Sequence, residues 1–91
     1  MSSIDIRRKH GKSLKQARAS VDKAAAAIGS KFDIESRWSG DTLQFSRSGV
    51  AGAIHVTPTE VHVTAELGFL LGMLKPAIEK EIAQQLDKQF G

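Results

Sequence analysis

Hydrophobic and polar residues alternate along this chain with two different periods, and each change of period predicts a boundary between elements. Residues 3–10 alternate with a period of two, so Ile4 and Ile6 share one side of a predicted strand. From Leu14 onward the apolar residues recur every three or four positions, which is typical of a helix with one buried stripe. We therefore expect a strand followed by a helix.

The predicted helix carries signals at both of its ends. Ser13, with Gln16 three residues later, is a capping-box pattern and predicts the helix start. Gly29 is the expected C-terminal stop. The apolar stripe comprises Leu14, Ala17, Val21, Ala25, Ile28 and Phe32.

Beyond this helix the period returns to two, which predicts four short strands within FDIESRW, TLQFSR, VAGAIHV and VHVTAEL. Gly40 with Asp41, and Ser48 with Gly49, suit two-residue hairpin turns. Pro58 suits the second position of a third tight turn. These turns predict a register in which apolar residues share one face. The predicted pairs are Trp38 with Leu43, Ser36 with Phe45, Phe45 with Gly52, Leu43 with Ile54, Ile54 with Val63, and Val56 with Val61.

The last segment is apolar at first and amphipathic afterwards. Leu74, Ile78, Ile82, Leu86 and Phe90 recur every four residues, which predicts a helix with a kink or break between Gly72 and Pro76. We expect one α+β domain, residues 1–91, in the order β-α-β-β-β-β-α. Its five-stranded antiparallel sheet carries both helices on one face.

The run over residues 67–74 holds more apolar surface than a helix on a sheet needs. Most of it is expected in the core, and the surplus predicts a second apolar partner. The residues expected to supply this contact are Phe69, Leu70, Leu71 and Met73.

Composition limits the function classes. The chain has no cysteine, which excludes disulfides and thiolate metal sites, and no apolar run approaches the ~20 residues of a membrane span. The net charge is +3, and residues 1–47 carry ten Lys/Arg against five Asp/Glu. Arg7, Arg8 and Lys9 are candidates to attract an anionic surface or partner. Nucleic acid is an unlikely partner, because no aromatic residue lies among these charges to stack on bases.

No residue pattern indicates catalysis. The carboxylates are scattered over turns and the polar face, and neither a nucleophile motif nor a phosphate-binding loop is present. His55 and His62 face each other in the predicted register, but a third metal ligand is lacking. We expect no enzyme activity, no catalytic residue, no metal and no cofactor.

Three sheet residues are candidates for binding a ligand. Trp38 and Phe45 lie on the apolar face, where an indole can cover the rim of a pocket or simply close the core. Arg47 ends the predicted strand that contains Phe45. There it can extend over the rim, pair with an acidic residue, or meet the carboxylate of a ligand.

The motifs RWSGDTLQFSRSGVAGAI and VHVTAELGFLLGMLKPAIEKEI resemble the polyhydroxyalkanoate (PHA) system protein family, and the resemblance extends over almost the whole chain. It implies a cytoplasmic bacterial protein associated with polyester storage granules, and it implies no catalytic residue. A weaker similarity is to a shortened helix-grip domain of the START-like class, which holds apolar ligands between a sheet and a long last helix.

Together these features predict a non-enzymatic accessory protein of PHA storage that binds the granule surface or a granule protein. Two alternatives stay open. One is a small carrier of an acyl or hydroxyalkanoate ligand in a groove between sheet and helix, and the other is a structural homodimer.

Overall fold

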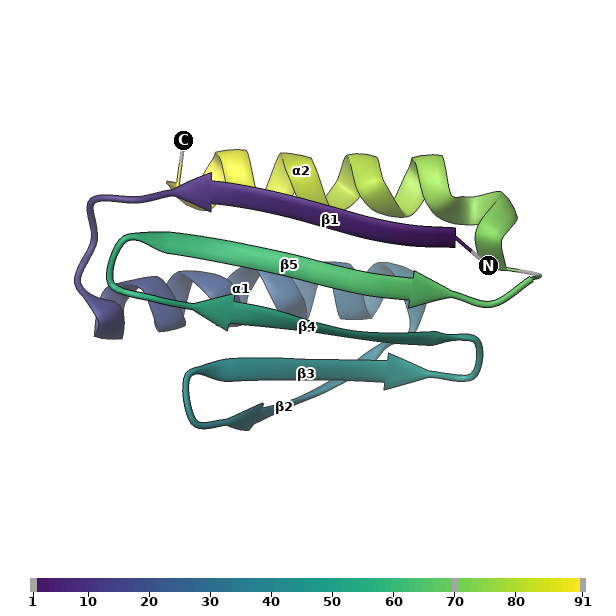
Figure 1. Ribbon diagram of the computed structural model, residues 1–91, viewed down its shortest axis with the longest axis horizontal. Coiled ribbons are helices and arrows are strands. Elements are labelled where there is room, and N and C mark those ends of the chain that lie inside the picture. The colour runs from purple at the N-terminus through teal and green to yellow at the C-terminus, as the bar shows by residue number, and fades with distance from the viewer. Residues whose placement is uncertain (1, 70, 91) are drawn as a thin grey trace.

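Five strands, two α-helices and one 3₁₀ turn follow one another along the chain in the predicted order (Figure 1). The computed structural model describes residues 2–69 and 71–90. The elements are β1 (Ser2–Lys9), α1 (Leu14–Phe32), β2 (Glu35–Ser39), β3 (Thr42–Arg47), β4 (Val50–Val56), β5 (Glu60–Leu67), the 3₁₀ turn η1 (Leu71–Leu74) and α2 (Lys75–Phe90). The predicted α+β architecture is therefore confirmed.

The strands form one antiparallel sheet in the order β1-β5-β4-β3-β2. All six predicted cross-strand pairs are present, including Phe45 opposite Gly52 and Ile54 opposite Val63. The two glycine turns explain why. Gly40 and Gly49 have φ values of +63° and +89°, a conformation that suits glycine because it lacks a Cβ atom. Each turn holds its strands in a register that keeps the apolar residues on one face.

The first strand closes the sheet by pairing with the last one, with Ser2 opposite Leu67 and Lys9 opposite Glu60. It ends at Lys9, one residue earlier than predicted. The His10 backbone N–H donates to the Thr59 carbonyl, and its ring Nε2 lies 2.8 Å from the Thr57 carbonyl oxygen.

Both helices cover the same face of the sheet (Figure 1). The buried side chains of this face pack against Ala17, Val21 and Ile28 of α1 and against the apolar stripe of α2. The opposite face carries the polar residues of each strand. The sheet contributes Ile4, Leu43, Val50, Ile54, Val56, Val61, Val63, Ala65 and Leu67 to the core, and α2 contributes Ile78, Ile82 and Leu86.

Helix α1 begins as predicted and ends later than predicted. Ser13 caps it, and the reciprocal contacts of the capping box with Gln16 are both present. The expected stop at Gly29 is wrong, because the helix continues to Phe32 and Asp33 takes the left-handed cap conformation at φ 57°. Gly29 instead allows a close approach: a Cβ atom there would lie 2.6 Å from the Ile34 carbonyl oxygen. The chain can therefore turn back tightly against its own helix.

The final apolar segment is divided among three structures. Leu67 belongs to β5, residues 71–74 form the 3₁₀ turn η1, and the regular helix α2 begins at Lys75. Pro76 lies in the first turn of α2, where its missing N–H costs no intrahelical hydrogen bond. The predicted break is present, and proline stands at the start of the last helix.

Candidate functional site

The exposed large hydrophobic residues of the described chain all come from one short segment after β5. Phe69 is 88% exposed, Met73 is 83% exposed and Leu74 is 43% exposed. We call Phe69, Leu71, Met73 and Leu74 the apolar loop. It lies at one end of the molecule, beside the start of β1 and the turn between β3 and β4 (Figure 1). Leu70, also predicted to supply contact area, lies outside the described residues.

Leu71 fixes this loop to the rest of the fold. Its side chain is half-buried against the core, and a Cβ atom added to Gly49 would lie 2.9 Å from Leu71 Cδ1. The Gly68 N–H also donates to the Gly49 carbonyl at 2.7 Å. Leu71 thus faces the protein, while Phe69 and Met73 face solvent.

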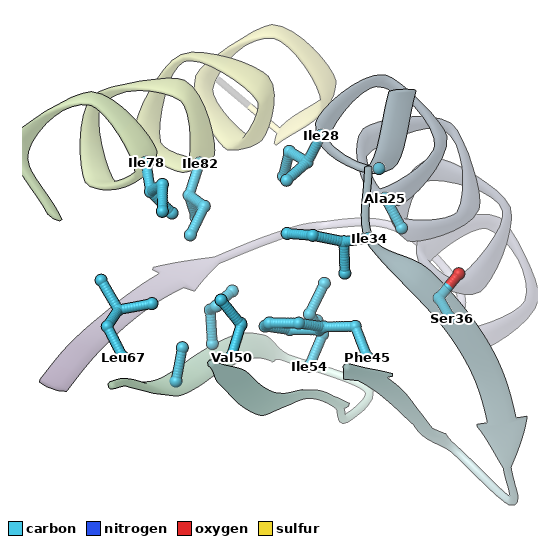
Figure 2. A pocket seen from close by; sticks show the side chains of 13 residues that line it. Ala25, Ile28, Ile34, Ser36, Phe45, Val50, Ile54, Leu67, Ile78 and Ile82 are labelled. Atoms are coloured by element: carbon cyan, nitrogen blue, oxygen red, sulfur yellow. The ribbon is translucent and has the colours of Figure 1, made fainter. Parts of the chain in front are cut away.

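Near the same end, a small apolar slit lies between the two helices and the sheet. Its free space is about 20 Å³, which is room for about one water-sized sphere. Figure 2 shows Ile28 of α1, Ile78 and Ile82 of α2, and Phe45 of β3 converging on this slit. Its lining comprises Ala25, Ile28, Gly29, Ile34, Ser36, Phe45, Val50, Ile54, Val63, Ala65, Leu67, Ile78 and Ile82.

Of the predicted ligand-binding residues, Phe45 lines the slit. Its ring covers Gly52 on the neighbouring strand, since a Cβ atom there would lie 2.6 Å from Phe45 Cζ. The only side-chain polar group in the lining is the Ser36 hydroxyl. Such a surface suits an aliphatic chain and offers little to a polar ligand.

Arg47 does not extend into the slit. Its Nη1 donates a 2.7 Å hydrogen bond to the Phe32 carbonyl, at the C-terminal end of α1. A cation there complements the partial negative charge of the helix end. The predicted pairing of Arg47 with an acidic side chain is replaced by this backbone contact.

Trp38 lies away from both the slit and the apolar loop. Its indole Nε1 donates to Asp22 Oδ1 at 2.5 Å, and the Arg18 guanidinium lies 4.4 Å from the centre of a Trp38 ring. These contacts attach β2 to the first half of α1. Trp38 therefore closes the core at one sheet edge and does not cover the slit.

The basic N-terminal residues lie at the opposite end of the molecule from the apolar loop. Arg7 pairs with Glu60 at 3.0 Å, and Arg8 pairs with Asp87 at 3.1 Å. Because β1 is aligned with β5, Lys9 lies about 20 Å along the strands from Leu67 at the usual rise per residue. One surface patch cannot include both the basic residues and the loop.

The two facing histidines are held by neighbours on the polar face. Their ring centroids lie 6.1 Å apart. His62 Nε2 lies 2.8 Å from Asp5 Oδ1, and His55 Nδ1 lies 3.1 Å from Thr42 Oγ1. Within residues 2–69 and 71–90, no group of three or more His, Asp or Glu side chains is arranged to hold a metal ion.

The two helices share one ion pair that sequence reasoning missed. Lys31 Nζ of α1 lies 2.7 Å from Glu81 Oε1 of α2. Glu81 is only 7% exposed, and the hydrogen bonds from Lys31 and Gln85 hold the pKa of its carboxyl below its ordinary value. A signal existed in the sequence, because residue 81 lies between stripe positions 78 and 82 and therefore close to the buried side of α2.

Comparison with protein families matches residues 4–90 to the family described as "Putative polyhydroxyalkanoic acid system protein". The chain belongs to this family. The match confirms the resemblance found in the sequence motifs. Neither the curated proteins nor the solved structures compared with the chain include a match, so the similarity to a helix-grip domain stays a prediction. Among the residues that the structure describes, no helix is long and apolar enough to cross a membrane.

Proposed function

We propose that this member of the PHA system family is a non-enzymatic accessory protein that attaches to the surface of cytoplasmic polyester granules. The apolar loop makes the contact. Phe69 and Met73 insert into the surface, Leu74 adds to the contact area, and Leu71 holds the loop in place from below.

The observation that carries this proposal is the concentration of exposed large hydrophobic side chains in a single segment of the described chain. Scattered exposed apolar residues are normal for a soluble protein, whereas a cluster indicates an interaction site. The segment is uncharged from Leu67 to Leu74, and its backbone is anchored through Gly68 to Gly49. The loop therefore presents its hydrophobic side chains from a supported position.

The size of the cluster favours insertion into a surface over a stable homodimer. Two fully exposed side chains and one half-exposed one expose a few hundred Å². A standard protein interface buries about 800 Å² on each partner. Insertion of Phe69 and Met73 into an apolar phase is worth about 1.5–3 kcal/mol for each side chain, which suffices for reversible attachment.

The non-enzymatic part of the proposal has support from the ionisable groups. The one buried carboxylate among the described residues, Glu81, already accepts hydrogen bonds from Lys31 and Gln85. On the polar face, His62 is held by Asp5 and His55 by Thr42. General acid–base work usually needs a titratable group in a shielded cleft.

Co-sedimentation tests the attachment. Purified protein is mixed either with native granules or with protein-free polyester particles, and the bound fraction is measured. Phe69→Asp with Met73→Asp should lower the bound fraction at least tenfold on both. Leu71→Asp is a poor test, because Leu71 is packed against the core and its loss destabilises the fold.

Thr59→Asp is the matched control, since it adds a charge to an exposed turn at the opposite end of the molecule. Equal binding of wild type and the double variant would refute the proposal. Binding to native granules but not to protein-free particles would indicate that the partner is a granule protein and not the polyester. A dimer of constant mass at all concentrations, without granule affinity, would favour the homodimer.

The slit supports a second function, the carriage of an acyl or hydroxyalkanoate ligand. Its lining is almost wholly aliphatic and it lies between the sheet and the two helices, where an acyl chain would be shielded from water. With space for only about one water-sized sphere, it must widen to admit a chain. Native mass spectrometry with decanoate tests this function, which requires a one-to-one complex.

A further inference from the structure

An open groove of about 540 Å³ lies along the first half of α1, beside Trp38 of β2. Its lining comprises Leu14, Lys15, Arg18, Ala19, Asp22 and Trp38. It shares no residue with the slit between the helices and the sheet. Because α1 begins at the end of the molecule opposite the apolar loop, the groove lies toward that end as well (Figure 1). A contact made there would be separate from the contact made by the loop.

The Arg18 guanidinium lies in this groove, 4.4 Å from the centre of a Trp38 ring. Asp22, four residues later on α1, is its natural helical partner, but Asp22 Oδ1 accepts from Trp38 Nε1 instead. Asp41 Oδ1 lies 3.8 Å from Arg18 Nη1, which is too far for a hydrogen bond. The guanidinium is therefore held against the indole, and within residues 2–69 and 71–90 its donors have no hydrogen-bond partner.

One of these donors is buried. Arg18 Nε has no partner among the described residues, although the side chain as a whole is 41% exposed. Buried polar atoms without a partner are rare in folded proteins and call for an explanation beyond stability. An arginine that is already held in place binds a carboxylate through two parallel hydrogen bonds from its planar guanidinium. The exposed end of Arg18 is therefore positioned to receive an anionic group from outside the fold.

Further cations lie near Arg18. Lys15 lines the groove one helical turn before it, Lys12 lies in the connection from β1 to α1, and Lys9 ends β1. None of these three lysines forms an ion pair with another described residue. The first turn of α1 also contains no acidic residue, so the positive end of the helix dipole adds to these charges. This end of the molecule therefore complements a partner that carries several carboxylates.

We propose that the groove binds an acidic segment of a partner protein, and that one carboxylate of this segment pairs with Arg18 beside the indole. The lysines attract the neighbouring carboxylates, and Leu14 and Ala19 offer apolar contact to a side chain between them. An open groove shields a small acid poorly, whereas a segment reaches all of these cations. A peptide is favoured over nucleic acid, because the Trp38 ring packs against the core and Arg18 instead of offering a face to a base. Since groove and loop lie at opposite ends, both contacts can form at once (Figure 1).

Fluorescence anisotropy with a labelled acidic peptide tests the groove. The probe is a fluorescein-labelled decapeptide of eight glutamates and two leucines, titrated with the full chain at 0.15 M salt, where charges more than about 8 Å away are screened. Arg18→Met keeps an apolar side chain beside Trp38 but removes the guanidinium, and should raise the Kd at least tenfold. Arg37→Met is the matched control, because it removes the same group from the opposite face of β2, and should change the Kd less than twofold.

Two further variants test the geometry of the contact. Asp41→Asn removes the carboxylate that lies 3.8 Å from Arg18 and competes with the peptide, and should lower the Kd at least twofold. Arg18→Lys keeps the charge but lacks the planar guanidinium, and should still raise the Kd at least threefold. Circular dichroism and thermal unfolding confirm that each variant is folded.

The outcomes separate a built site from general attraction between charges. No binding of the peptide by wild type overturns the proposal, and so does an equal loss in Arg18→Met and Arg37→Met. Tighter binding of a decathymidylate than of the peptide, with the same sensitivity to Arg18→Met, would make nucleic acid the partner and overturn the peptide. Phe69→Asp with Met73→Asp should bind the peptide as wild type does, so attachment to granules is decided separately.

Discussion

At the scale of single residues, close contacts decide which positions accept a side chain. Gly52 lies on the apolar face beneath the Phe45 ring, and the Thr64 carbonyl oxygen approaches from the adjacent strand. Neither neighbour can move freely, because Phe45 lines the slit and Thr64 belongs to the central ladder. Glycine is needed at position 52 because of these two close contacts and not because of a turn, since Gly52 lies within β4.

Gly52→Ala should lower the free energy of unfolding by about 1–3 kcal/mol, the usual range for overpacking a filled site. Gly11→Ala is the control, because a Cβ atom at Gly11 would meet nothing within 4 Å. Urea denaturation of both variants measures the difference. A loss at Gly11 as large as that at Gly52 would contradict the account of the close contact.

At the scale of elements, the contact between α1 and α2 combines an apolar stripe with one ion pair, in which Glu81 is buried and Lys31 is exposed. The hydrogen bond from Lys31, followed by that from Gln85, holds the Glu81 pKa below its ordinary value. A lowered pKa in the folded state means that the unfolded chain binds the proton more tightly. The charged form therefore stabilises the folded protein at neutral pH.

The stability difference between wild type and Glu81→Gln should depend on pH in one direction. It should stay constant from pH 8 down to about pH 5, where the wild-type carboxyl is ionised in both states. It should shrink as pH falls below the ordinary value of about 4.5, through the lowered folded pKa. Thermal unfolding at a series of pH values checks this, and a difference that grows on acidification would rule it out.

At the scale of the whole molecule, the two features that suggested an external partner lie at opposite ends. The longest dimension of the fold is 37 Å. The apolar loop lies at one end of the strands, and the basic residues that follow Asp5 lie toward the other (Figure 1). Attachment through the loop therefore leaves Lys9 and Lys12 directed away from the granule.

Lys9→Glu combined with Lys12→Glu should leave co-sedimentation with granules unchanged within twofold at 0.15 M salt and above. The physical reason is distance, because screening at 0.15 M salt limits charge effects to about 8 Å. The bound fraction at 0.15 M salt and at one higher salt concentration provides the measurement. A strong loss at 0.15 M salt would show that the basic end, and not the loop, contacts the granule.

The strand register could be predicted because it depends on local rules. Alternation assigns each residue to a face, and the glycine turns at Gly40 and Gly49 then allow one alignment of the hairpins. The start of α1 was predictable for the same reason, because the contacts of Ser13 with Gln16 span only three residues. The end of α1 was not predictable, because Gly29 does not stop the helix. It leaves room for the Ile34 carbonyl oxygen, which packs back against the helix.

The candidate site was predicted only in part. The sequence identified an apolar segment with surplus surface, but not that Phe69 faces solvent while Leu71 packs beneath Gly49. It identified Arg47 and Trp38 as rim residues, yet Arg47 binds the Phe32 carbonyl and Trp38 binds Asp22. These partners come from other elements, and the spacing along one strand carries no information about them.

By itself, the sequence determined the elements, their order, the face that each strand buries and the family to which the chain belongs. Those properties depend on the spacing of the apolar residues, on the residues in the turns and on the family motifs, which are all local features of the sequence. The tertiary structure alone decided which apolar residues remain exposed, where the slit forms, that Lys31 meets Glu81, and that the basic and apolar ends lie apart. Each of these depends on the distance between residues far apart in sequence, which only the packing of helices on the sheet establishes.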